Sequence, residues 1–235
     1  MTSRFLFTFP DLGFARFAWH RLLIIISALS LCACANISEL SQFKKAAELA
    51  VFGNPDAPVE RAYIDKLPYA SIRAKMGPSG RVIMILGRYD GPDLHWISAD
   101  YVALATRKGR IVKSAGLPET LANTIFVGPD PIITRGANQW DAPVPARRFV
   151  DIEPGAHYGI TIASTIERIG VEEIEILGRR HQTILLRERA YAAHLDWSFE
   201  NYFWLDMETG FVWKSIQHVT PSLPPIEIET LKPAG

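Results

Sequence analysis

Most of the chain beyond residue 60 consists of short apolar segments separated by turn residues. Residues 81–87 are the clearest example, because a run of Val, Ile, Met and Leu follows Gly80 and ends at a second glycine. An apolar, β-branched run of this length between turn residues is typical of a buried strand. Residues 93–98, centred on Trp96, predict a second strand of the same kind.

Two pairs of such segments predict hairpins. Gly109 and Gly210 each lie in a short polar connection between two apolar runs. A glycine adopts the positive φ that a tight turn or a bulged hairpin loop requires, at no steric cost. The paired segments are residues 101–106 with 111–114, and residues 201–206 with 211–216.

The second half of the chain predicts further strands in the same style. The last of them follows Pro224 and Pro225, and prolines at this position favour an edge strand. Glu172, Glu173 and Glu175 alternate with apolar residues, which is typical of a strand with one solvated face. The predicted segments are residues 149–153, 158–169, 172–177, 182–191 and 226–231.

Helical patterns are few. Residues 37–51 predict one amphipathic helix, and residues 119–126 predict a second, short one after Pro118. Residues 141–145 contain a break that either separates two halves or forms a long loop inside one barrel. Many short strands with few helices predict a mainly β fold, an antiparallel β-sandwich or barrel with a short N-terminal helix.

The N-terminus has the pattern of a secretory leader. A basic stretch containing Arg16 and Arg21 precedes an apolar run over residues 22–31 that is too short to span a bilayer. The run ends at Leu31-Cys32-Ala33-Cys34, which is typical of a lipoprotein cleavage and lipidation site. Cleavage before Cys34 places small Ala33 at the position before the cut, whereas cleavage before Cys32 would place bulky Leu31 there. We therefore predict that Cys34 becomes the first mature residue.

Lipidation of Cys34 would define both the compartment and the domain organisation. Residues 1–33 are the predicted signal peptide, residues 34–60 a lipidated tether with the short helix, and residues 61–235 a β-rich domain. A diacylglycerol and an N-acyl chain on Cys34 would hold the protein at the membrane, since each buried methylene contributes about 0.8 kcal/mol. No cysteine would remain for a disulfide. Ala35 is not the aspartate typical of inner-membrane retention, which favours the outer membrane.

Composition narrows the range of partners. Without the leader, the 25 basic residues fall to 22 and the 25 acidic residues to 24, a net charge of −2. This balance lacks the basic footprint of a nucleic-acid-binding protein. No second apolar run approaches the length of a membrane span.

Candidate chemistry is sparse. The histidines beyond the leader have no metal-ligand spacing, so we predict no metal and no cofactor other than the acyl chains. Aromatic residues are more prominent, and Trp96, Trp204 and Trp213 are candidates for contact with a glycan or a partner. Tyr69 follows a proline in a turn. We expect its ring to pack under the sheet, with docking to a partner as the alternative.

Residues 64–71 resemble the I-x-x-(M/L)-P-Y-A-S segment of the YjbF/GfcB family of lipoproteins. Residues 201–206 with Gly210 resemble the family's N-x-Y-W-x-D…G hairpin, and the leader also fits. The resemblance implies a mostly β outer-membrane lipoprotein on the periplasmic face, associated with exopolysaccharide and group 4 capsule secretion. It supplies no catalytic residues. Further segments that fit in order are residues 96–100, 106–113, 116–117, 130–131 and Trp140.

Three functions follow as hypotheses. The first is a non-enzymatic accessory or scaffold lipoprotein of exopolysaccharide export, whose partners are the membrane and an outer-membrane β-barrel protein of the same system. The second is a glycan- or lipid-binding β-barrel module. The third, an envelope enzyme, lacks a catalytic constellation in the sequence.

Overall fold

A computed structural model describes residues 59–235 of the chain. The predicted signal peptide, Cys34 and the predicted helix over residues 37–51 lie outside the described residues. Within the described range, no helix has the length and apolar character needed to cross a membrane. The elements are α3 (Arg61–Lys66), β1 (Ser71–Met76), β2 (Val82–Asp90), β3 (Asp93–Ser98), β4 (Ala103–Arg107), β5 (Arg110–Ala115), β6 (Thr120–Phe126), α4 (Pro131–Thr134), β7 (Val144–Glu153), β8 (His157–Ile176), β9 (Arg179–Ala192), the 3₁₀ helix η1 (Ala193–Leu195), β10 (Trp197–Asp206), β11 (Val212–Gln217) and β12 (Ile226–Lys232).

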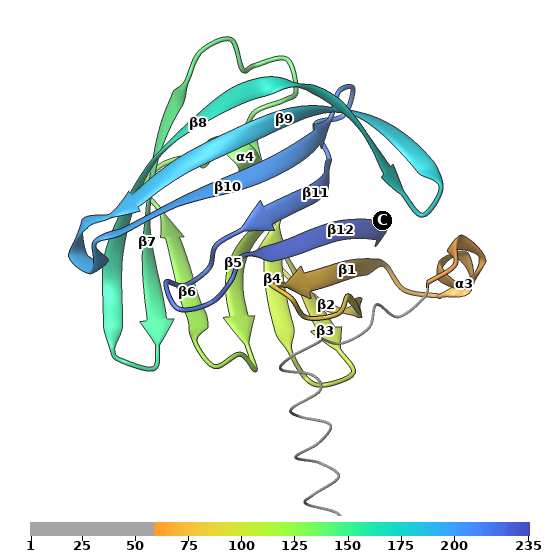
Figure 1. The fold of residues 1–235 in the computed structure, drawn as a ribbon, viewed down its shortest axis with the longest axis horizontal. Helices are drawn as coiled ribbons and strands as arrows, with labels where there is room; N and C mark the ends of the chain where they lie inside the picture. Colours follow the sequence, from red (N-terminus) through yellow and green to blue (C-terminus); the bar gives the residue numbers. More distant parts are fainter. Residues whose placement is uncertain (1–58) are drawn as a thin grey trace, which may run out of the picture. The chain divides into compact units, whose positions relative to one another are not determined.

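The twelve strands form one antiparallel sheet that curls into a nearly closed barrel (Figure 1). The strand order is β5-β4-β3-β2-β1-β12-β11-β10-β9-β8-β7-β6. Each strand therefore pairs with its neighbour in sequence, except that β1 pairs with β12 and β5 does not pair with β6. Of the two predicted architectures, a sandwich and a barrel, the chain adopts the barrel.

Side chains bridge the seam, the junction between β5 and β6. The hydroxyl of Ser114 accepts a hydrogen bond from the backbone N–H of Leu121 at 2.9 Å. The hydroxyl of Thr124 donates to the backbone carbonyl of Val112 at 2.8 Å. These bonds satisfy backbone groups that would be paired if β5 and β6 formed a continuous ladder. The barrel is therefore completed without backbone pairing between β5 and β6.

The β4–β5 turn meets the opposite wall of the barrel. The side-chain amide of Gln217 on β11 accepts from the backbone N–H of Ile111 at 2.9 Å and donates to the carbonyl of Gly109 at 2.8 Å. Gly109 has φ +87°, and a Cβ at this position would overlap Val212. Glycine is therefore required here both for the turn and for close contact with β11.

The barrel interior has two apolar clusters with a layer of polar residues between them. Alternate residues of β9 point inward, so Ile184 and Leu186 belong to one cluster, and Ala190 and Ala192 to the other. Glu188 lies between these pairs and is fully buried. Arg148 on β7, Ser164 on β8 and Asn201 on β10 are also buried, and each donates a hydrogen bond to Glu188. We call these four residues the polar layer.

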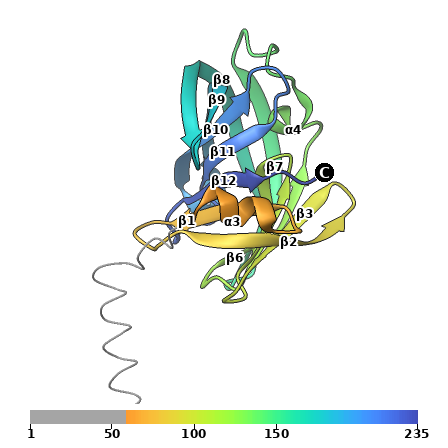
Figure 2. The ribbon, with the colours of Figure 1, turned by 90° about the vertical axis from the view of Figure 1, so that its right-hand side faces the viewer.

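A third cluster lies on the outside of the barrel, beneath α3. Ile64 of α3 packs with Ile174, Ile176, Trp204 and Leu231. Figure 2 shows α3 beside β1 and β12, and Figure 1 shows the long β8–β9 hairpin reaching toward it. Arg61 fixes this contact by donating to the carbonyl oxygens of Leu231 at 2.7 Å and Ile176 at 2.8 Å.

The predicted hairpins are confirmed, with φ values of +87° at Gly109 and +72° at Gly210. The prediction of a short helix over residues 119–126 is wrong, because this segment forms β6 and pairs with β7 from Thr120 to Phe126. Its side chains also bridge the seam, and pairing of this kind overrides a weak local preference.

Two further expectations are corrected. Residues 226–231 do not form an edge strand, because β12 pairs with both β1 and β11. Pro224 and Pro225 precede the strand and occupy no ladder position, so they do not prevent pairing on both sides. The segments 158–169 and 172–177 are one continuous strand, β8, which has a bulge between Arg168 and Gly170. The break predicted at residues 141–145 lies inside one barrel, where residues 141–143 lead into β7 and residues 144 and 145 already belong to that strand.

Candidate functional site

The most polar part of the barrel interior is centred on Glu188. One carboxylate oxygen, Oε2, accepts hydrogen bonds from Arg110 Nη1 at 2.9 Å and Asn201 Nδ2 at 2.7 Å. The other, Oε1, accepts from Arg148 Nη1 at 2.6 Å, Ser164 Oγ at 2.8 Å and Arg110 Nη2 at 3.3 Å. Five donors therefore surround a side chain that has no exposed surface, which compensates for the cost of burying its charge.

Arg110 links this network to the segment that contains α4. Its Nε lies 2.9 Å from Oδ2 of Asp130, and both side chains are buried. Asp130 also caps α4, because its Oδ1 accepts from the backbone N–H of Ile132 at 2.9 Å. The guanidinium stacks over the ring of Phe203, 5.1 Å from its centroid. Two arginines thus face two carboxylates, and the buried charges balance.

The network favours the charged forms of Glu188 and Arg110, whereas burial lowers the pKa of Arg148 despite its contact with Glu188. Burial alone would raise the pKa of Glu188, but the guanidiniums of Arg110 and Arg148 hold the pKa of this carboxyl well below its usual range. Burial opposes the charge of Arg110 as well, yet Asp130 and Glu188 raise its pKa above the usual value. A carboxylate that is ionised, saturated with donors and shielded from solvent is unsuited to proton transfer near neutral pH.

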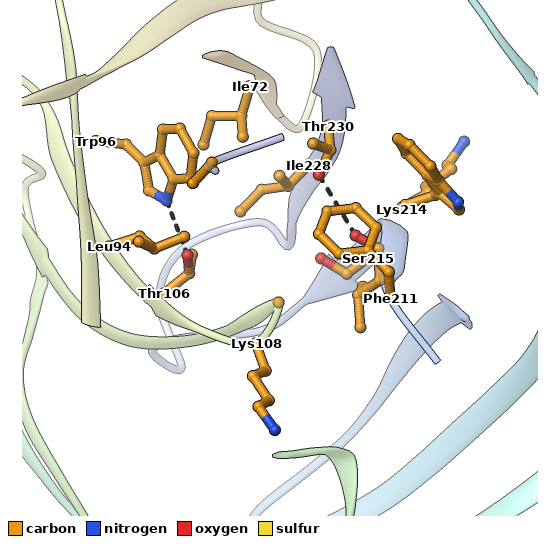
Figure 3. Close-up of a pocket in the computed structure, with 14 residues that line it drawn as sticks. Ile72, Leu94, Trp96, Thr106, Lys108, Phe211, Lys214, Ser215, Ile228 and Thr230 are labelled. Carbon is orange, nitrogen blue, oxygen red and sulfur yellow. Dashed lines mark hydrogen bonds between the residues drawn. The ribbon is translucent and has the colours of Figure 1, made fainter. Parts of the chain in front are cut away.

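A small cavity lies between the walls formed by β3 and by β11 and β12. Figure 3 shows Trp96, Leu94 and Ile72 on one side and Phe211, Ser215 and Ile228 on the other. Its volume is about 90 Å³. Pockets for small organic ligands usually measure about 300–1,000 Å³, so this cavity suits water rather than a sugar ring.

Trp96 and Trp213 both line this cavity, but Trp96 belongs to an interior cluster, whereas Trp213 also packs against the outer cluster that contains Trp204. Trp96 is 3 % exposed and donates from Nε1 to Thr106 Oγ1 at 2.8 Å. Trp213 is the extra residue of a bulge opposite Trp204 and Leu205. Its Nε1 donates to Asp206 Oδ2 at 3.1 Å.

Trp213 is also packed against other rings. The ring of His181 lies 3.8 Å from it, and that of Phe211 lies 4.8 Å away, with distances taken between centroids. Burial lowers the pKa of His181 despite the nearby carboxylate of Asp206. This environment fixes the Trp213 indole in place and leaves only part of it accessible.

The other two predicted residues lie elsewhere. Trp204 is buried in the outer cluster beneath α3, and its Nε1 donates to Glu172 at 2.9 Å. Tyr69 is 54 % exposed, so the expectation that its ring packs under the sheet is wrong. The turn that follows α3 directs this ring into solvent. Of the two alternatives for Tyr69, docking to a partner is the one compatible with its exposure.

Other site chemistry is limited in residues 59–235. In this range no group of three or more His, Cys, Asp or Glu side chains is arranged to hold a metal ion. The polar layer was not predicted from the sequence. A signal for it exists, because Glu188 occupies an inward position in the row Ile184, Leu186, Ala190 and Ala192, where the alternation calls for an apolar residue.

The described residues form a side-chain-filled antiparallel barrel with a buried ionic layer. Residues 44–231 match the family described as "Group 4 capsule polysaccharide lipoprotein gfcB, YjbF". The chain belongs to this family, which confirms the resemblance in its sequence motifs. Family membership also indicates association with the cell envelope.

Comparison with individual relatives supports this family assignment. The chain is 26 % identical over 219 residues to the Escherichia coli K12 protein named "Uncharacterized lipoprotein GfcB", covering 91 % of this chain and 98 % of that one. It is 22 % identical over 185 residues to "Uncharacterized lipoprotein YjbF" of the same strain, covering 79 % and 85 %. The crystal structure of the hypothetical lipoprotein YmcC from Escherichia coli K12 superimposes with a TM-score of 0.68 at 28 % identity, covering 75 % of this chain and 90 % of that one. None of these names states a catalytic activity.

Proposed function

We propose that this protein is a non-enzymatic accessory or scaffold lipoprotein of exopolysaccharide or capsule secretion, anchored through Cys34 to the periplasmic face of the outer membrane. The observation that carries the proposal is membership of the group 4 capsule polysaccharide lipoprotein family across residues 44–231. The sequence motif at Cys34 supports the anchor, and Ala35 after it supports sorting to the outer membrane.

The barrel interior supports a role other than catalysis. Its buried carboxylate, Glu188, is fully occupied by donors from Arg110, Arg148, Ser164 and Asn201. The cavity between β3 and the β11–β12 wall, of about 90 Å³, is too small to hold a saccharide unit. An interior of this kind stabilises a rigid body, and the partners of such a body meet its outer surface.

A partner protein is part of the proposal. An outer-membrane β-barrel protein of the same secretion system would share the membrane with the lipid anchor. Tyr69 is a candidate contact, because it is 54 % exposed and lies three residues beyond the end of α3. Replacing Tyr69 with Ala is expected to leave the melting temperature unchanged and to weaken co-purification of the partner from membranes.

The alternative function is a glycan- or lipid-binding module. The observation that favours it is the meeting of Trp96 and Trp213 on one cavity. At its present volume the cavity would have to widen to admit a ligand, which makes the outer surface the better place for a glycan. Titration of the protein with purified polysaccharide, followed by tryptophan fluorescence, tests an interior site directly, since both indoles would report on it.

Deletion of the gene tests the main proposal. Loss of surface polysaccharide under producing conditions, restored by the wild-type gene, is the expected result. Polysaccharide that stays at its normal level in the deletion strain would rule out a role in secretion.

A further inference from the structure

The outer face of β8, β9 and β10 has a groove of about 500 Å³ that is open to solvent. These three strands run side by side in the long arch of Figure 1. The volume falls in the range of about 300–1,000 Å³ that is usual for small-ligand sites, and is more than five times that of the interior cavity.

Side-chain size explains why the sheet is hollowed here. Tyr191 on β9 lies between Ala163 on β8 and Ser198 on β10 in register. Arg189, two residues earlier on the same face, lies between Thr165 and Glu200. Small residues on either side of a large one leave space beside the Tyr191 ring, and side chains two residues apart share one face of a strand.

The aromatic residue of the groove is exposed yet held in place. Tyr191 is 44 % exposed, and its hydroxyl donates to Asp196 Oδ1 at 3.1 Å. When an apolar surface covers a fixed aromatic face that was in contact with water, the free energy of the complex falls. The ring loses little conformational entropy when it is covered, because its orientation is already set.

The polar groups of the groove are also ordered by their neighbours. Arg189 contacts Glu200 Oε1 through Nε at 3.2 Å and Glu167 Oε1 through Nη1 at 3.0 Å. Tyr202 donates to the other carboxylate oxygen of Glu200. Beyond these contacts, a guanidinium has further N–H donors and each carboxylate oxygen a second lone pair, so Arg189 and Glu200 can still bond to hydroxyl groups.

We infer that this groove binds uncharged sugar units of the exported polysaccharide, with a pyranose ring packed on Tyr191 and its hydroxyls bonded to Arg189 and Glu200. This inference rests on the proposed role in polysaccharide secretion. A sugar has an apolar C–H face and a rim of hydroxyls, which match the ring and the polar pair. The lining residues include one cationic and one anionic side chain, so the groove favours a neutral segment over a polyanion.

Calorimetric titration of the full-length lipoprotein in detergent tests the inference. The probe is the surface polysaccharide of the producing strain, cleaved to oligosaccharides. Tyr191→Ala is expected to weaken binding about tenfold or more, because it removes the stacking face, whereas Tyr191→Phe retains most of the affinity. Tyr89→Ala is the matched control, since Tyr89 is 58 % exposed on β2, which is separated from β10 by β1, β12 and β11.

A second variant and a salt series make the test independent of Tyr191. Ser198→Trp fills the hollow from the exposed face and is expected to abolish binding while leaving the melting temperature unchanged. Added salt is expected to change the affinity little, because screening weakens charge attraction and a neutral ligand offers none. Binding that survives both groove variants, or no saturable binding by the wild-type protein, would overturn the inference.

Complementation separates this inference from the proposed function. If the deletion strain makes normal polysaccharide, the proposed function fails. If deletion lowers polysaccharide but the Tyr191→Ala and Ser198→Trp genes restore it as fully as the wild-type gene, only the groove assignment fails.

Discussion

Arg110 and Glu188 form a two-point ion pair in the barrel interior, with Nη1–Oε2 at 2.9 Å and Nη2–Oε1 at 3.3 Å. Arg110 is the first residue of β5, at one end of the sheet order, whereas Glu188 belongs to β9, eight places further along that order. The pair therefore joins two walls of the barrel that share no backbone pairing. It lies close to the seam, where the sheet itself does not close.

Replacing Glu188 with Gln is expected to destabilise the protein by about 3 kcal/mol or more. The change leaves the guanidiniums of Arg110 and Arg148 buried beside a neutral amide, and removing one partner from a buried ion pair is costly. Urea unfolding of the purified protein measures the loss. The control is Glu173→Gln on the exposed end of β8, which is expected to change stability by less than about 0.5 kcal/mol. Equal stabilities for both variants would contradict the role assigned to the ion pair.

Stability is also expected to fall in acid. The usual pKa of a glutamate, 4.5, applies in the unfolded chain, and the pKa of Glu188 in the folded barrel lies well below it. As the pH falls through 4.5, the unfolded chain therefore takes up a proton that the folded chain does not. The free energy of unfolding then decreases as the pH falls from about 5 toward 2. Glu188→Gln lacks this contribution, and its free energy of unfolding is expected to depend less steeply on pH. Parallel curves for the two proteins would show that Glu188 is not the group responsible.

Replacing Gly109 with Ala tests the contact between the β4–β5 turn and β11. The new Cβ would overlap Val212 and would also be strained at φ +87°. Gly128→Ala isolates the backbone strain, because Gly128 has φ +80° and open space around it. The control is expected to cost about 1 kcal/mol and Gly109→Ala at least about 2 kcal/mol more. Similar losses of thermal stability in both variants would mean that the turn does not pack against Val212.

Gln217→Leu tests the closure of the barrel at β5. The substitution keeps the side chain large but removes the amide that pairs with Ile111 and Gly109. Hydrogen exchange at the Ile111 amide is expected to accelerate about tenfold or more, since losing a buried hydrogen bond costs about 1–3 kcal/mol. Gln182→Leu, an exposed glutamine on β9, serves as the control. An unchanged exchange rate at Ile111 would contradict the closure by Gln217.

Local patterns predicted the strands and the hairpin turns well, because alternation and glycine placement reflect neighbouring residues. They did not predict that residues 120–126 form a strand, since its partner β7 follows more than 15 residues later. They also did not predict that β12 is central, because its pairing with β1 joins segments about 150 residues apart. Long-range pairing of this kind is decided by the whole fold.

The sites were harder to predict than the fold. Tryptophans are conspicuous in a sequence, yet Trp96 and Trp204 proved to be buried. The polar groups that matter came from strands far apart in sequence, as with Arg110 and Glu188. The outer groove depends on Ala163 and Ser198, whose small size has meaning only beside Tyr191 in the folded sheet.

The surface polysaccharide of a deletion strain that carries residues 35–235 behind a cleavable, non-lipid signal peptide tests the central claim most directly. A scaffold must be held at the membrane to act, so this soluble form is expected to restore little surface polysaccharide, whereas the wild-type gene restores all of it. Immunoblotting should show equal amounts of both proteins in the envelope. Full restoration by the soluble form would contradict the account, because it would show that the protein acts without its anchor.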